Sequence, residues 1–235
     1  MLHQLLSGAP RALPSSCALC GQEEGSALCG TCRMQFFAAR KPRCACCGIG
    51  LASAADARCG DCVKQPPAFD ATIVAADYGA PVDRLVLALK FGNRLEIAPL
   101  FAQLLLQAAK GSTTPEVLTA VPLGPQRLLQ RGFNQALEIA RPLSRRLRVK
   151  LDPHLVARHR ETQSQSMLHP DERHRNIRNA FVVPARAMDM VRGRHIGVVD
   201  DVMTTGETLN ELAATLKRFG AARVTNIVFA RTPQR

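Results

Sequence analysis

Six residues between positions 200 and 208 combine two carboxylates, three hydroxyls and a glycine within one strand–turn–helix pattern. They are Asp200, Asp201, Thr204, Thr205, Gly206 and Thr208. The turn leads directly into a helix, so its backbone N–H groups, hydroxyls and positive helix end surround one point, which suits a phosphate. The carboxylates suit the hydroxyls of an attached sugar, directly or through a metal ion. A capped helix after a buried strand would explain one Asp or one Thr, but not the whole run.

Eight cysteines form four Cys-x-x-Cys pairs, and a ninth, Cys46, lies beside one of them. The paired residues are Cys17, Cys20, Cys29, Cys32, Cys44, Cys47, Cys59 and Cys62. Two such turns make a closed tetrahedral site, the usual geometry of structural zinc, so four turns predict two Zn²⁺ ions. The short spacers suit sequential pairing, although a crossed arrangement and a single occupied site stay open. An iron–sulfur cluster is the alternative metal centre, since four cysteines ligate that as well.

The composition limits the classes of protein that the chain can form. With 235 residues, 46% of them hydrophobic, it can form one α/β domain and a small additional module. The formal net charge of +12 suits a polyanionic partner, although a solvated basic surface has the same composition. No apolar segment reaches the length of a membrane span, and residues 1–16 lack the apolar core of a signal peptide. We therefore expect a cytoplasmic protein, whose reduced thiols favour metal over disulfides.

The strands and helices that position the carboxylates, hydroxyls and cysteines alternate along the sequence. The expected strands cover 71–76, 117–121, 195–199 and 224–230. One expected helix begins at Pro81, and three others cover 95–109, 133–147 and 207–219. Loops are expected at 122–132 and 159–179. Such alternation predicts an α/β fold with a mainly parallel sheet. The Pro-rich linker near 63–70 divides the chain into a cysteine-rich zinc module, residues 1–66, and a second domain, residues 67–235.

The stretch from Ile196 to Thr208 resembles the signature of type I phosphoribosyltransferases that binds 5-phosphoribosyl-1-pyrophosphate (PRPP). In that signature four apolar residues precede Asp-Asp-x-x-Thr-Thr-Gly-x-Thr, and the one departure here is Gly197, which would allow close packing. The resemblance implies that Asp200 and Asp201 bind the ribose 2′ and 3′ hydroxyls. It also implies that four residues surround the 5′-phosphate, namely Thr204, Thr205, Gly206 and Thr208.

Further motifs make the chain similar to the ComF family, also called ComFC or GntX-like, from Cys17 to Arg231. They are the four Cys-x-x-Cys pairs, Leu89-Lys90-Phe91, Arg131-Gly132-Phe133-Asn134-Gln135, and the Arg-x-Thr-x-x-Gln pattern of Arg160, Thr162 and Gln165. The resemblance implies a type I phosphoribosyltransferase fold behind a double zinc ribbon. Bacterial members are linked to natural competence, to the handling of incoming DNA and to its use as a nutrient.

Three cations are candidates for the pyrophosphate of PRPP: Arg127, Arg131 and Lys90. Several negative charges need paired cations, and planar guanidinium groups suit phosphate oxygens. Ordinary solvated side chains are the alternative for each of them. Asn134 is a candidate helix cap. The family pattern further places Arg160, Thr162 and Gln165 on a loop that would close over the substrate, although a merely disordered loop fits them as well.

The implied activity is a phosphoribosyltransferase that displaces pyrophosphate from the ribose, with Mg²⁺ bridging pyrophosphate and sugar hydroxyls. No apolar hood for a nucleobase is evident in the sequence, so the acceptor is unknown. The alternative is a non-catalytic factor that uses the PRPP-type pocket for DNA handling or ligand sensing. Expected partners are PRPP or a related phosphoribosyl ligand, and single-stranded DNA or DNA-uptake proteins.

Overall fold

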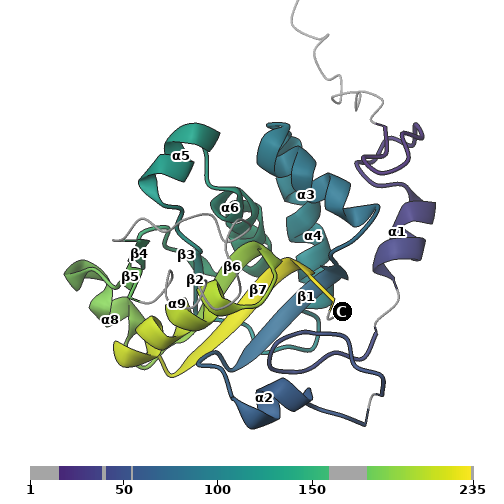
Figure 1. The fold of residues 1–235 in the computed structure, drawn as a ribbon. Coiled ribbons are helices and arrows are strands. Elements are labelled where there is room, and N and C mark those ends of the chain that lie inside the picture. The colour runs from purple at the N-terminus through teal and green to yellow at the C-terminus, as the bar shows by residue number, and fades with distance from the viewer. Residues whose placement is uncertain (1–15, 39–40, 54, 159–178, 234–235) are drawn as a thin grey trace, which may run out of the picture.

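The computed structural model describes residues 16–38, 41–53, 55–158 and 179–233, which form a five-stranded parallel sheet with helices on both faces (Figure 1). The strand order is β1-β7-β6-β2-β3. The bounds are Ala71–Asp77 for β1, Val117–Ala120 for β2, Lys150–Leu151 for β3, His195–Met203 for β6 and Arg223–Arg231 for β7. A separate antiparallel pair joins β4 (Ala157–Arg158) to β5 (Phe181–Val182). The predicted α/β class with a mainly parallel sheet is confirmed.

Three of the longer helices cover the sheet. α4 (Ala98–Ala108) and α6 (Gln135–Leu147) pack together on one face, where they contact β1 and β6, and α9 (Glu207–Arg218) packs on the other face against β7 (Figure 1). The remaining helices are α1 (Gly30–Phe37), α2 (Gly60–Lys64), α3 (Val82–Phe91), η1 (Leu95–Ile97), α5 (Pro125–Arg131), η3 (Ala185–Ala187) and α8 (Met188–Val191). Among the described residues, no helix has the length and apolar character that crossing a membrane requires.

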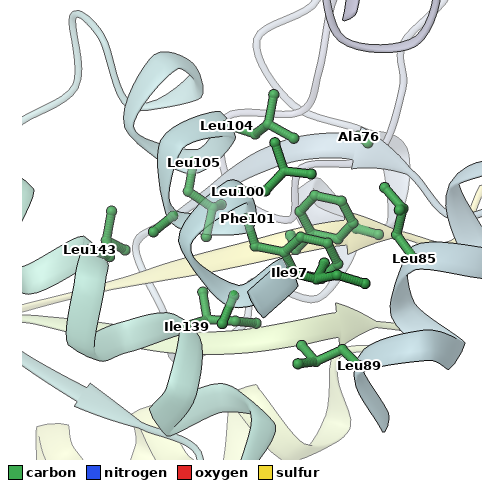
Figure 2. Packing of buried hydrophobic residues seen from close by; sticks show 14 of the residues in the cluster. Ala76, Leu85, Leu89, Ile97, Leu100, Phe101, Leu104, Leu105, Ile139 and Leu143 are labelled. Atoms are coloured by element: carbon green, nitrogen blue, oxygen red, sulfur yellow. The ribbon is translucent and has the colours of Figure 1, made fainter. Parts of the chain in front are cut away.

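The core on the α4 face is built from side chains at helical spacing. Leu85 and Leu89 of α3 are fully buried, and they meet Phe101 and its neighbours on α4 (Figure 2). Phe101 stacks on Phe229 of β7, with ring centroids 3.4 Å apart. Burial of such aromatic and aliphatic groups is the main favourable contribution to folding. This packing places the end of α3, and hence Lys90, beside the sheet.

Two local predictions near the carboxyl edge of the sheet were wrong. Residues 125–131, expected as part of a basic loop, form α5, in which Pro125 occupies the first turn and Gly132 ends the helix at φ +79°. α5 buries none of its residues, so the sequence shows no apolar face to reveal it. Strand β6, expected to end at 199, continues to Met203 because it stays paired with β7 through Val202 and Met203.

The two halves of the cysteine-rich module pack on different faces of the sheet. Cys17 and Cys29 belong to the hydrophobic cluster that includes α3 and α4, whereas Cys44 and Cys47 belong to the cluster under α9. Between them lies the edge strand β1, which Gly48 approaches so closely that a Cβ atom there would lie 2.4 Å from Val74. The second half of the module is therefore packed against the sheet. The division near residue 66 stays a prediction.

Candidate functional site

The end of β6 carries both predicted carboxylates. Asp201 is 2% exposed, and its backbone N–H donates to Oδ1 of the half-buried Asp200 at 2.9 Å. The chain then turns at Gly206, whose φ of +91° favours glycine, and enters α9 at Glu207. A Cβ atom on Gly206 would also lie 2.5 Å from the side chain of Met203. Backbone conformation and space together account for glycine at this position.

A cavity of about 400 Å³ opens beside this turn. Eight of the nine residues predicted to bind PRPP line it: Lys90, Arg127, Arg131, Asp200, Asp201, Thr204, Gly206 and Thr208. They come from α3, α5, β6, the turn after β6 and the start of α9, which meet at the carboxyl edge of the parallel sheet, the usual position of ligands in such folds. The exception is Thr205, which is exposed and whose Oγ1 accepts a hydrogen bond from the N–H of Glu207 at 3.5 Å. Thr205 is thus placed to cap α9.

Asp201 is held by partners from two other elements. Nζ of Lys90 lies 2.5 Å from its Oδ2 atom, and Nε2 of Gln135 donates to its Oδ1 atom at 3.3 Å. Arg131 in turn donates to Oε1 of Gln135. The chain of contacts Arg131–Gln135–Asp201–Lys90 connects two cations to one buried carboxylate. Charge-assisted hydrogen bonds of this kind fix side-chain orientation.

The electrostatics of the carboxylate pair differ from those of exposed aspartates. Removal of the Asp200 carboxyl from water and repulsion by Asp201 raise the pKa of Asp200 well above its ordinary value, and the Lys90 cation opposes this rise. The pair therefore favours an arriving cation or hydroxyl donor, because either would relieve the repulsion between the two carboxylates.

The two arginines bring positive charge to the lining of the cavity. Nη2 of Arg127 is buried and makes no hydrogen bond within the part of the chain that the structure describes. The guanidinium of Arg131 lies over the ring of Phe91, 5.4 Å from its centroid. The two guanidinium groups and Lys90 thus line one cavity, and three cations there would suit a polyphosphate.

Sequence reasoning missed several residues of the site. Gln135 was read only as part of a family motif, yet it orients Asp201. Tyr78, Leu87 and Leu123 also line the cavity, and no motif reveals them because they come from separate segments. Phe91, from the Leu89-Lys90-Phe91 motif, lines it too, although the motif gave no sign of this role. Asn134 caps α6, as predicted, by accepting hydrogen bonds from the N–H groups of Ala136 and Leu137. Arg160, Thr162 and Gln165 lie outside the described residues.

The cysteines form two separate groups of four. The sulfur atoms of Cys17, Cys20, Cys29 and Cys32 lie within 4.8 Å of one another, and so do those of Cys44, Cys47, Cys59 and Cys62. Contacts of 3.6 Å between Cys20 and Cys29 and between Cys47 and Cys59 approach the sulfur separation of about 3.8 Å that tetrahedral ligation at about 2.3 Å requires. The pairing is sequential rather than crossed, and both donor sets fit Zn²⁺.

The family of the chain follows from comparison with known proteins. Residues 10–63 match the family model for a double zinc ribbon domain, and residues 134–235 match that for a phosphoribosyl transferase domain. The chain is 38% identical over 219 residues to DNA utilization protein YhgH of Escherichia coli O6:H1, covering 90% of this chain and 95% of that protein. It is 34% identical to Competence protein F of Haemophilus influenzae, and the match covers 84% of this chain and 87% of that protein. The chain belongs to the ComF/YhgH family.

Membership of the ComF/YhgH family agrees with the two metal centres. The double zinc ribbon match covers all eight cysteine ligands, and together with their geometry it supports two Zn²⁺ ions rather than iron–sulfur clusters. Among solved structures, a glutamine PRPP amidotransferase from B. subtilis is similar over 57% of this chain and 25% of that one, with 17% identity and a TM-score of 0.36. A hypoxanthine phosphoribosyltransferase of Trypanosoma cruzi is similar over 57% of this chain and 62% of that one, with 18% identity and a TM-score of 0.33.

Proposed function

We propose that this ComF/YhgH-family protein binds PRPP with Mg²⁺ at the end of β6 and acts in the cytoplasm in the use of incoming DNA. The observation that carries the proposal is the meeting of the Asp200–Asp201 pair, the glycine turn and three cations in one cavity. The relatives named for DNA utilization and competence support the cellular role. The cytoplasm suits a protein whose nine cysteines form no disulfide and of which eight are grouped as metal ligands.

Each group in the cavity has a part in holding PRPP. Asp200 and Asp201 would accept hydrogen bonds from the ribose 2′ and 3′ hydroxyls. The turn from Thr204 to Thr208 would bind the 5′-phosphate through hydroxyls and backbone N–H groups at the positive end of α9. Thr205 would contribute as part of this turn, although its side chain is placed to cap α9.

The pyrophosphate would lie against Arg127, Arg131 and Lys90. A buried Nη2 atom of Arg127 without a described partner gains a hydrogen bond when a phosphate oxygen arrives. Lys90 would exchange its contact with Asp201 for one with the pyrophosphate. Two adjacent carboxylates are oxygen donors of the kind that Mg²⁺ prefers, and the ion would neutralise charge on the leaving pyrophosphate.

The reaction we infer is transfer of the phosphoribosyl group. The bond between the anomeric carbon and pyrophosphate breaks, a bond to the acceptor nucleophile forms on the opposite face, and the acceptor proton leaves to the solvent or the pyrophosphate. The chain contributes position and charge stabilisation. An apolar, planar acceptor would lie against the apolar and aromatic residues of the cavity lining, which include Tyr78, Leu87, Phe91 and Leu123.

Single-stranded DNA is the macromolecular partner that we propose. Five cations lie exposed on and just after α6: Arg141, Arg145, Arg146, Arg148 and Lys150. Cations on one surface bind phosphates without reading sequence, and such binding weakens steeply as the salt concentration rises. Salt-insensitive binding, or no binding at low salt, would remove DNA from the proposal and leave the PRPP site unaffected.

Calorimetric titration of PRPP with Mg²⁺ into the zinc-loaded protein tests the site directly. The double variant Asp200→Asn/Asp201→Asn is expected to remain folded and to lose binding, whereas Asp189→Asn, an exposed aspartate on α8, is expected to bind like the parent. Equal affinity of parent and double variant would refute the site. Absence of binding to the parent would refute PRPP as the ligand and leave the non-catalytic DNA-handling alternative.

A further inference from the structure

One buried arginine connects the second cysteine cluster to the phosphate-binding turn. Arg231 is the last residue of β7 and is 7% exposed. Its Nε atom donates to the carbonyl oxygen of Cys47 at 3.2 Å, and its Nη1 atom donates to the carbonyl oxygen of Met203 at 3.1 Å and to that of Thr204. A single guanidinium thus contacts a zinc-ligating residue and the first residues of the turn.

The charge around Arg231 is unusual for a buried arginine. Within the described residues it forms no ion pair with a carboxylate, and its side-chain hydrogen bonds go to backbone carbonyls, including that of Thr232 at 3.1 Å. A buried cation is costly without a compensating negative charge. The second cysteine cluster, whose Cys47 carbonyl Arg231 binds, would provide that charge when it holds zinc, since four thiolates around one Zn²⁺ carry a net charge of about −2.

The direction of these hydrogen bonds matters for the turn. Arg231 holds the carbonyl groups of Met203 and Thr204 by their oxygen atoms, and the N–H of Thr232 also donates to the Met203 carbonyl at 3.0 Å. Carbonyl oxygens that are bound on the side of β7 and Cys47 are kept away from an anion in the cavity. The turn is thus held in one arrangement before a ligand arrives, which lowers the cost of ordering it on binding.

We propose that Arg231 is a positioning residue that couples the second zinc site to the phosphate-binding turn. Loss of Zn²⁺ from the Cys44/Cys47/Cys59/Cys62 site releases the Cys47 carbonyl, so the Arg231 guanidinium loses an acceptor that fixes it and the turn at 203–208 loosens. For the first zinc site, whose residues belong to the cluster on the opposite face of the sheet, no such hydrogen-bonded connection to the turn occurs among the described residues. Because linkage is reciprocal, a ligand bound at the turn raises the zinc affinity of the second site only.

Hydrogen–deuterium exchange on the full chain, without added ligand, tests the coupling independently of the proposed function. Cys59→Ser and Cys20→Ser are matched variants, because each replaces the least buried ligand of its own cluster. Faster exchange of the amides at 203–208 is expected in Cys59→Ser and in Arg231→Lys, with exchange unchanged in Cys20→Ser. Equal exchange in the two cysteine variants, or unchanged exchange in Arg231→Lys with both zinc ions retained, would overturn the proposal. If Cys59→Ser exchanges faster throughout the chain, the Arg231→Lys result decides.

The expected change in affinity for PRPP rests on the proposed function, so it is interpreted separately from the exchange experiment. Titration of PRPP with Mg²⁺ is expected to show on the order of tenfold weaker binding in Arg231→Lys and in Cys59→Ser, the effect of about one lost charge-assisted hydrogen bond, and parental binding in Cys20→Ser. Parental affinity in Arg231→Lys would contradict a positioning role. If the parent itself does not bind PRPP, the proposed function fails and the exchange experiment still decides the coupling.

Discussion

Lys90 and Asp201 form an ion pair with 2.5 Å between Nζ and Oδ2, joining the last turn of α3 to β6. The Asp201 side chain is 3% exposed and that of Lys90 is 23% exposed, so the pair is largely shielded from water. The contact holds a proposed ribose-binding carboxylate and a proposed pyrophosphate-binding cation in one arrangement. It also explains how an acidic group is accommodated in the buried part of the sheet.

Replacement of Lys90 by Met is expected to lower the free energy of unfolding by about 1–3 kcal/mol, because Asp201 would keep a buried carboxylate without its cation. Urea unfolding measures the change. Lys110→Met, which alters an exposed lysine after α4, is the control and is expected to change stability by less than about 0.5 kcal/mol. Adding Asp201→Asn to Lys90→Met should recover part of the loss, and strict additivity of the two single changes would contradict the pairing.

Arg127→Met is expected to weaken binding of the pyrophosphate end of PRPP without weakening binding of the ribose 5-phosphate end. If Arg127 binds only the pyrophosphate, affinity for PRPP should fall by about ten- to a hundredfold, while affinity for ribose 5-phosphate stays the same. Calorimetry with both ligands measures this difference. Arg145→Met removes an equal charge from the exposed face of α6 and should leave both affinities unchanged. A parallel loss for both ligands in Arg127→Met would place Arg127 elsewhere in the site.

The zinc content should follow the sequential grouping of the cysteines. The parent is expected to carry two Zn²⁺ ions per chain, Cys17→Ser and Cys44→Ser one each, and the combined variant none, because each change opens a different tetrahedral site. Loss of solubility should accompany loss of metal, since zinc binding contributes to folding of such modules. Metal analysis of purified protein gives the ratios. Two ions in either single variant would contradict the ligand sets.

Asp70 should make stability depend on pH. Its Oδ2 atom accepts from the N–H of Val224 at 2.7 Å and lies 2.8 Å from Nζ of Lys217. Burial acts to raise the pKa of Asp70, but Lys217 and the Val224 N–H outweigh it, so the pKa is lower than its ordinary value. A lowered folded-state pKa contributes stability above the ordinary value of about 3.9, and this stability is lost as pH falls through the folded value.

Asp70→Asn is therefore expected to be about 1 kcal/mol less stable than the parent at pH 7, with the difference shrinking below about pH 4. Unfolding of both proteins across this range measures it, and any acid release of zinc that both share cancels in the difference. The exposed Asp189→Asn should show no such pH dependence. A difference that stays constant down to pH 3 would show that the charge of Asp70 is not responsible.

The parts of the molecule that the sequence alone determined are those in which neighbouring residues create the geometry. The turn after β6 needs Gly206 for its φ of +91°, and its hydroxyl and carboxylate residues lie within nine positions, so the phosphate-binding interpretation follows from local order. Each Cys-x-x-Cys pair likewise brings two sulfurs together through one turn, and the short spacers favoured sequential grouping. Alternating strand and helix periodicity was sufficient for the α/β class.

Tertiary packing decided the contacts that join distant segments. Lys90, Gln135 and Arg231 reach β6 and the turn after it from three elements, and no spacing in the chain indicates that Gln135 holds Asp201 or that Arg231 joins Cys47 to Thr204. Pairing with β7 keeps Asp200 and Asp201 within a strand that hydrophobicity alone would have ended earlier. Local periodicity records which side of an element is apolar, whereas the partner of a buried polar group depends on how the elements meet.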